Sequence, residues 1–165
     1  MPENFFKNMK QRIQLFLVLL IMGGTACCLT SCRENAHSDY RTIHQLVIND
    51  DLAGVTQDLK GYPGDINLVD DAGQTPLHLA AIHCRTNVLI YLLDHGAHIE
   101  TRAKGDTTPL HLAAQAGCLN AVTILLSHGA NINAHDRDEH TPLARAEEWH
   151  QDAVAAYLRD HGGQE

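Results

Sequence analysis

Hydrophobic and polar positions along most of this chain follow a period of 33 residues. A block of threonine, proline and closely spaced leucines and alanines begins at Thr75, Thr108 and, with altered residues, Thr141. A second block of paired apolar positions followed by histidine and glycine reaches its glycine at Gly96, Gly129 and Gly162. A third, a short Asp/Asn–Ile–Asn-like segment, lies just beyond at 65–67, 98–100 and 131–133. Three blocks in one fixed register indicate an internal structural repeat.

Each repeat predicts two helices followed by a polar turn. A threonine hydroxyl can cap free helix amides, and proline is tolerated in the first turn, where its missing N–H is not needed. The leucines and alanines that come next form a narrow apolar face against which a second helix can pack. That second helix is expected at about 87–93 and 120–127, ended by Gly96 and Gly129, since glycine readily adopts positive φ. Polar segments 70–74 and 104–107 predict hairpin-like turns.

These motifs resemble the ankyrin repeat across residues 40–165. The resemblance implies an all-α solenoid of about four helix–turn–helix repeats with hairpin-like turns, in units of about 40–70, 71–103, 104–136 and 137–165. The first unit is degenerate, with helices expected at about 41–49 and 51–60. In the last unit Ala144 replaces the motif histidine and Arg145 replaces leucine. That departure suits a terminal unit, whose outer face must meet water.

The first 32 residues have the pattern of a secretory signal. Basic residues precede an apolar run from Ile13 to Met22, and small residues come next at 23–26. The run is too short for a comfortable membrane span, which needs about 20 residues. The segment Leu29–Cys32 resembles the bacterial lipobox, which implies cleavage before Cys32 and acylation of that cysteine. Cys27 is a weaker second candidate, and an ordinary cleaved signal or an uncleaved anchor is the alternative.

The lipobox resemblance implies a lipid-anchored protein of the bacterial envelope that faces the periplasm. Residues 33–39 are polar and are expected to form a tether between the lipid and the fold. The residue after Cys32 is Arg33, whereas aspartate there resembles an inner-membrane retention signal. The outer membrane is therefore the expected attachment.

The charge of the chain limits the classes of partner that it can bind, and its cysteine content bears on whether a disulfide forms. The chain carries a formal charge of −8, and removing residues 1–32 leaves nine basic and nineteen acidic side chains. Because that surface repels phosphate backbones and carries no basic stripe, nucleic-acid binding is not expected. Only Cys84 and Cys118 remain outside the signal. Their offset by one position in neighbouring repeats favours two separate thiols over a disulfide, which stays as the alternative in an oxidising periplasm.

No residue pattern indicates catalysis, a cofactor, a small-molecule substrate or a metal. A nucleophile elbow, a phosphate-binding glycine loop and paired catalytic carboxylates are missing from the sequence. Five of the twelve histidines recur at repeat positions, and the rest lack Cys/His ligand spacing. His78 and His111 match a motif position that, by the resemblance, forms hydrogen bonds within and between repeats. The chain is therefore expected not to be an enzyme.

By the same resemblance, partners bind the concave surface formed by the turn tips and the inner helices. The predicted partner-binding residues at the tips are Asp70, Asp71, Gln74, Arg102, Lys104, Asp106, His135, Arg137 and Asp138. Those at the ends of the inner helices are Ile82, His83, Gln115, Glu148 and Trp149. Trp149 is the only tryptophan, and interface hot spots are enriched in this residue type. The alternative is that Trp149 packs under the last repeat as core.

The expected function is that of a membrane-tethered protein-binding module. Small ankyrin lipoproteins resemble immunity proteins that neutralise phospholipase effectors delivered by type VI secretion, so a secreted lipase toxin is the expected partner. The alternatives are a periplasmic ankyrin protein that supports catalase and oxidative-stress defence, and an envelope scaffold.

Overall fold

The computed structural model describes residues 43–164. The chain separates into two units, residues 1–40 and 41–165, and the described residues all belong to the second unit. The predicted signal, the Cys32 lipidation site and the tether at 33–39 therefore lie outside the described residues. Within residues 43–164 no helix is both long enough and apolar enough to cross a membrane.

Residues 43–164 form an all-α fold, as the sequence predicted. Eight α-helices succeed one another in four pairs, and no strand occurs in this part of the chain. The first helices of the pairs are α2 (Ile43–Ile48), α4 (Pro76–Ile82), α6 (Pro109–Gln115) and α8 (Pro142–Glu148). The second helices are α3 (Leu52–Gly61), α5 (Thr86–Asp94), α7 (Leu119–Ser127) and α9 (Asp152–Asp160). A 3-10 helix, η2 (Pro63–Asn67), comes after α3.

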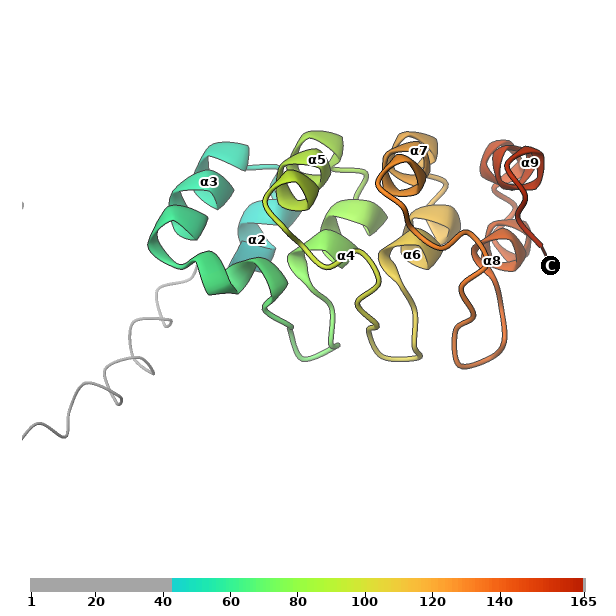
Figure 1. The fold of residues 1–165 in the computed structure, drawn as a ribbon, viewed down its shortest axis with the longest axis horizontal. Coiled ribbons are helices and arrows are strands. Elements are labelled where there is room, and N and C mark those ends of the chain that lie inside the picture. Colours follow the sequence, from blue (N-terminus) through green and yellow to red (C-terminus); the bar gives the residue numbers. More distant parts are fainter. Residues whose placement is uncertain (1–42, 165) are drawn as a thin grey trace, which may run out of the picture. The chain divides into compact units, whose positions relative to one another are not determined.

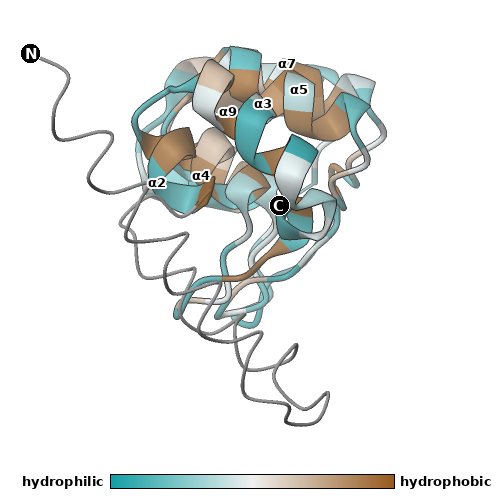
Figure 2. Cartoon of the chain, turned by 90° about the vertical axis from the view of Figure 1, so that its left-hand side faces the viewer, coloured by the Kyte–Doolittle hydropathy of each residue, from teal (hydrophilic) through white to brown (hydrophobic). Residues whose placement is uncertain are grey.

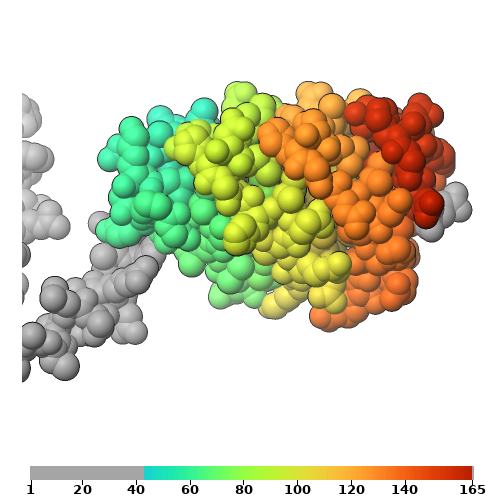
Figure 3. Space-filling view, in the orientation of Figure 1, coloured from blue at the N-terminus to red at the C-terminus, as the bar shows by residue number. Residues whose placement is uncertain are grey.

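The helices form two rows, and the repeats stack side by side. Figure 1 shows α3, α5, α7 and α9 in one row above α2, α4, α6 and α8, with the turns between repeats projecting beyond the lower row. In the space-filling view the repeats succeed one another as consecutive slabs (Figure 3). Each repeat therefore covers the apolar face of the next, as expected for a solenoid.

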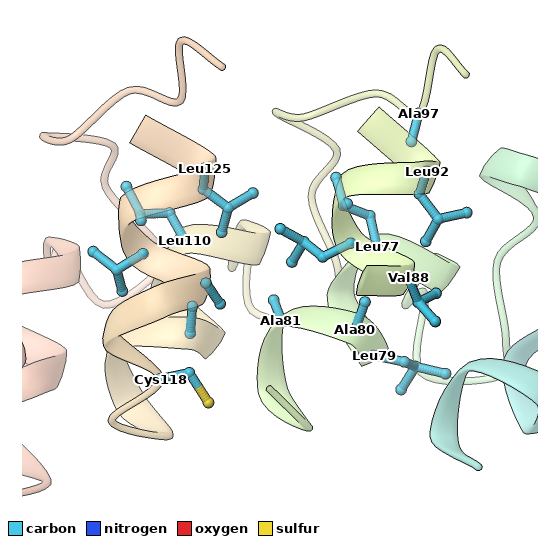
Figure 4. Close-up of a cluster of buried hydrophobic side chains, with 14 of the residues drawn as sticks. Leu77, Leu79, Ala80, Ala81, Val88, Leu92, Ala97, Leu110, Cys118 and Leu125 are labelled. Carbon is cyan, nitrogen blue, oxygen red and sulfur yellow. The ribbon is translucent and has the colours of Figure 1, made fainter. Parts of the chain in front are cut away.

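The apolar core lies between the two rows. Leu77 and Leu110 from the first helices, and Leu92 and Leu125 from the second, are at most 1% exposed (Figure 4). Ala80 and Ala81 are fully buried, and their small side chains let α4 approach its neighbours closely. Hydrophobic colouring is concentrated on the helices in Figure 2. Within the described residues this core extends from Ile43 to Leu158 and so runs through all four repeats.

The helix ends are explained by the sequence. Thr75 and Thr108 cap α4 and α6 in capping boxes that their histidines at the third helical position complete. Gly96, Gly129 and Gly162 come after the second helices with φ of 89–92°, which glycine adopts without steric cost. At the sharp junction between the two helices of a repeat, Asp50, Cys84, Gly117 and His150 all have positive φ. This repeated junction was not predicted, because only one of its four residues is glycine.

One prediction about the cysteines was wrong. Cys84 and Cys118 form a disulfide, with their Cα atoms 5.5 Å apart, within the usual range for such bonds. The prediction of separate thiols assumed that the backbones of neighbouring repeats stay too far apart. Cys84 instead lies in the left-handed turn after α4, and Cys118 at the start of α7 points back toward that turn, with its sulfur 4.0 Å from the carbonyl of Ile82.

Candidate protein-binding surface

The projecting turns are closed by hydrogen bonds of their own. In each, the first residue donates its N–H to the carbonyl four residues on: Asp70 to Gln74, Ala103 to Thr107 and Asp136 to His140. In the first and third turns an aspartate side chain adds two more bonds. Asp70 Oδ1 accepts from the amides of Ala72 and Gln74 at 2.8 Å, and Asp136 Oδ1 accepts from those of Asp138 and His140. These carboxylates therefore shape the turns.

Adjacent turns are joined to each other. The N–H of Lys104 donates to the carbonyl of Ala72 at 3.1 Å, and that of Arg137 donates to Gly105 at 2.9 Å. The guanidinium of Arg102 adds a bond to the carbonyl of His135 at 2.8 Å. The three turns thus form a connected row along the solenoid.

Two buried histidines connect the inner helices to this row. His78 Nδ1 accepts from the Thr75 amide, and its Nε2–H donates to the carbonyl of Thr107 in the next turn at 3.2 Å. His111 repeats the arrangement toward the carbonyl of His140 at 3.0 Å. Burial lowers the pKa of both imidazoles below the ordinary 6.5, because a cation is poorly solvated there. Both therefore serve as neutral hydrogen-bonding groups.

A third histidine has the same role and was not predicted. His44 on α2 is 8% exposed, and its Nε2 lies 3.1 Å from the carbonyl of Gln74 and 3.0 Å from that of Leu68. The degenerate first repeat lacks the threonine–proline signal, so the motif did not identify it. The last repeat has Ala144 at this position, and no further turn comes after it in the described residues.

Arg145 is the centre of a charged cluster on the last repeat. Its guanidinium contacts Asp136 at 2.6 Å, Glu148 at 2.8 Å and Asp138 at 3.4 Å. The Arg145 side chain is 17% exposed and that of Asp136 is completely buried. Burial opposes ionisation of Asp136, but the hydrogen bonds from Arg145 and two backbone amides outweigh it and lower the pKa of this carboxyl. Arg145 was expected to be exposed to solvent on the outer face of the last repeat. Its side chain instead holds the third turn against α8 through Asp136 and Asp138.

Trp149 is exposed beside this cluster. It comes directly after α8, and its N–H donates to the carbonyl of Arg145 at 3.2 Å. The residue is 52% exposed, so it is not core, and the surface interpretation is the one that the structure supports. Because Arg145 contacts both the third turn and Glu148, the turn tip and the end of α8 belong to one surface.

We call this the turn surface: the three turns at 70–74, 103–107 and 136–140 with the C-terminal ends of α4, α6 and α8. Nine of the predicted partner-binding residues on or beside it are exposed: Asp71, His83, Arg102, Lys104, His135, Arg137, Asp138, Glu148 and Trp149. Asp70, Gln74, Ile82, Asp106 and Gln115 are half-buried. Within residues 43–164, the third turn is where a predicted turn residue, Asp138, and a predicted helix-end residue, Glu148, are brought together, because both contact Arg145. Arg145, which holds these two residues together, was not among the predicted site residues, although an arginine at a position where the other repeats have leucine indicated an unusual role.

Asp136, Asp138 and His140 also bring potential metal-ligating atoms within 4.8 Å of one another. Hydrogen bonds within the chain account for this arrangement. Asp136 is occupied by Arg145 and by the amides of the turn. The hydrogen bonds of the closed turn are therefore sufficient to explain why these three side chains lie close together.

A protein-family comparison agrees with this architecture. The model described as ankyrin repeats (3 copies) matches residues 38–136 and 101–165. Together the matches cover well over half of the chain.

Proposed function

Because the chain belongs to the ankyrin-repeat family, whose members are protein-interaction modules, we propose that it binds its partner through the turn surface with Trp149 as the main contact. The observation that carries this proposal is the 52% exposure of the only tryptophan. A large aromatic ring left half in water gains apolar burial when a partner covers it, and such residues dominate interface energies. The connected turns hold the surrounding side chains in place before binding, which lowers the entropic cost.

We further propose that the protein is held at the bacterial envelope by lipid on Cys32 and faces the periplasm. The lipobox-like Leu29–Cys32 segment supports this location. The Cys84–Cys118 disulfide also supports it, since disulfides persist in the periplasm and are rare in the cytosol.

The partner that we propose is a phospholipase delivered by type VI secretion, which the protein would neutralise. A lipid tether supports this assignment, because an inhibitor held at the membrane meets a membrane-attacking enzyme at high effective concentration. The resemblance to small ankyrin immunity lipoproteins supports it as well. In this role the protein contributes no catalysis and acts by covering a surface of the enzyme.

A capture experiment tests the proposal. Residues 33–165, the part that follows the proposed lipidation site, are used as bait against the purified products of the neighbouring genes. We expect stoichiometric capture of a lipase and loss of its phospholipase activity at a 1:1 ratio. Capture of a haem enzyme without inhibition would favour a role in stress defence, and no specific capture would favour a scaffold; either result contradicts the lipase assignment.

A further inference from the structure

We propose that the C-terminal end of the turn surface accepts an arginine or lysine side chain of the partner, which stacks on Trp149 and pairs with the exposed carboxylates of Asp138 and Glu148. This inference rests on the proposed function and specifies the chemistry of the partner. It concerns one surface patch, the acidic tryptophan patch: Asp138, Glu139, Glu148 and Trp149. All four residues are exposed.

The balance of charge in this patch favours a cation. Arg145 contacts three carboxylates but carries one positive charge, which the completely buried Asp136 offsets. No positive charge is therefore left over to balance the negative charges of Asp138 and Glu148. Their side chains are 69% and 50% exposed. Arg137, the other cation of this turn, lies 3.6 Å from Asp106 of the neighbouring turn. Within residues 43–164 the outward-facing carboxylates are therefore not fully neutralised.

Burial places the charges in layers. The Arg145 side chain is 17% exposed, intermediate between the completely buried Asp136 and the more exposed Asp138 and Glu148. An approaching partner thus meets negative oxygens first, while Arg145 holds Asp138 and Glu148 in position. A guanidinium that displaces water here could form charge-assisted hydrogen bonds to carboxylates that are already oriented.

Trp149 supplies the second element of recognition. It follows Glu148 directly in the sequence and is 52% exposed. A cation over the face of an indole is attracted by the ring quadrupole, and tryptophan is the best aromatic residue for this contact. The combination selects a basic side chain over an acidic one, and arginine suits it because its planar guanidinium can stack and donate at the same time.

The opposite end of the turn surface lacks this combination. At the first turn, Asp70 uses its carboxylate for the turn itself, and His83 occupies the position equivalent to Trp149. The second turn has Lys104 at its tip, with Ala116 at the helix end. A basic segment of the partner is therefore expected at the last repeat.

Intrinsic fluorescence tests the inference directly, because Trp149 is the only tryptophan. Residues 33–165 are titrated at about pH 8, where free histidine is largely neutral, with a tryptophan-free peptide carrying three arginines. The control is the same peptide with citrulline in place of arginine, which keeps the shape and removes the charge. We expect the arginine peptide to change the Trp149 emission and to bind at least about fivefold more tightly than the citrulline peptide, with a loss of affinity at high salt.

Matched variants locate the effect. The double variant Asp138→Asn/Glu148→Gln keeps the side-chain shapes and should weaken the arginine peptide about fivefold or more. Asp160→Asn, an exposed carboxylate at the end of α9, removes a charge elsewhere and should change affinity less than about twofold. Equal binding of the citrulline peptide, or unchanged binding by the double variant, would overturn the inference. If Trp149→Ala abolishes capture of the lipase while the double variant does not weaken it, the proposed function stands and this inference fails.

Discussion

At the scale of single residues, Arg145 shows how one substitution changes a repeat. The two preceding repeats have Leu79 and Leu112 at this position, both buried. Where the last repeat has Asp136, the second of them has Ala103 and the first has Asp70, which is only half-buried. In the last repeat the aspartate is completely buried and is paired with an arginine. Each compensates the burial of the other, and together they close the third turn.

Replacing Arg145 with leucine should destabilise the fold by about 3–5 kcal/mol, because the Asp136 carboxylate would stay buried without its partner. The double variant Asp136→Ala/Arg145→Leu reproduces the pattern of the third repeat and should recover most of that loss. Urea unfolding of the three proteins measures both effects. A double variant as unstable as the single one would show that the buried charge is not the cause.

The buried motif histidines predict a dependence of stability on pH. The pKa values of His78 and His111 are lowered in the folded state, below the ordinary 6.5 that the unfolded chain retains. Below about pH 6.5 the unfolded chain therefore binds more protons than the folded one, so stability falls with acidification; it is fully present above that pH. Asp136, with a pKa below 3.8, affects only more acidic conditions.

The measurement is the urea midpoint between about pH 7.5 and pH 5. We expect the midpoint to fall on acidification, and to fall less steeply in His111→Asn, which removes one of the two titrating rings. A midpoint that rises toward pH 5 would contradict the assignment of neutral, hydrogen-bonded rings.

At the scale of helices and turns, the disulfide fastens two repeats at their helix junctions. It closes a loop with a sequence separation of 34 and links the turn after α4 to the start of α7. Solenoid stability depends on the contacts between neighbouring repeats. A covalent link there holds the second and third repeats together when the chain opens locally.

Replacing Cys84 with serine should therefore lower the free energy of unfolding by about 3–4 kcal/mol, the chain-entropy value for a loop of this length. Thermal unfolding with and without reductant provides the comparison. Reductant should destabilise the unaltered protein and leave Cys84→Ser unchanged. Equal melting temperatures for oxidised and reduced protein would show that the link does not constrain the unfolded chain.

The elements that could be predicted from the sequence are those that local signals specify. The 33-residue period placed the helix pairs, and Gly96 and Gly129 located the ends of the second helices α5 and α7 within one residue. The disulfide could not be predicted, because it depends on how closely two junctions approach in space. The same holds for the Arg145 cluster: the substitution was visible, but its contacts to a turn nine residues away in sequence were not.

At the scale of the whole molecule, two functions are proposed for different segments. In this proposal residues 1–32 direct the protein to the envelope and attach it, and residues 43–164 bind the partner. This division predicts that attachment and binding can be separated by substitution.

Replacing Cys32 with serine should abolish incorporation of radiolabelled palmitate and release the protein from the membrane fraction. Binding of the partner by the released protein should be unchanged, because the turn surface lies in the other unit. Persistent labelling would move the lipidation site to Cys27 or Cys28, or contradict the lipoprotein assignment.

The central claim is that the turn surface binds a protein through Trp149, and the affinity of Trp149→Ala for the captured partner tests it most directly. The melting temperature of the same variant is measured alongside. We predict affinity at least about tenfold weaker, the loss of an interface hot spot, with a stability change below about 1 kcal/mol because the ring is half exposed. Unchanged affinity, or a large loss of melting temperature that accounts for weaker binding, would contradict the claim.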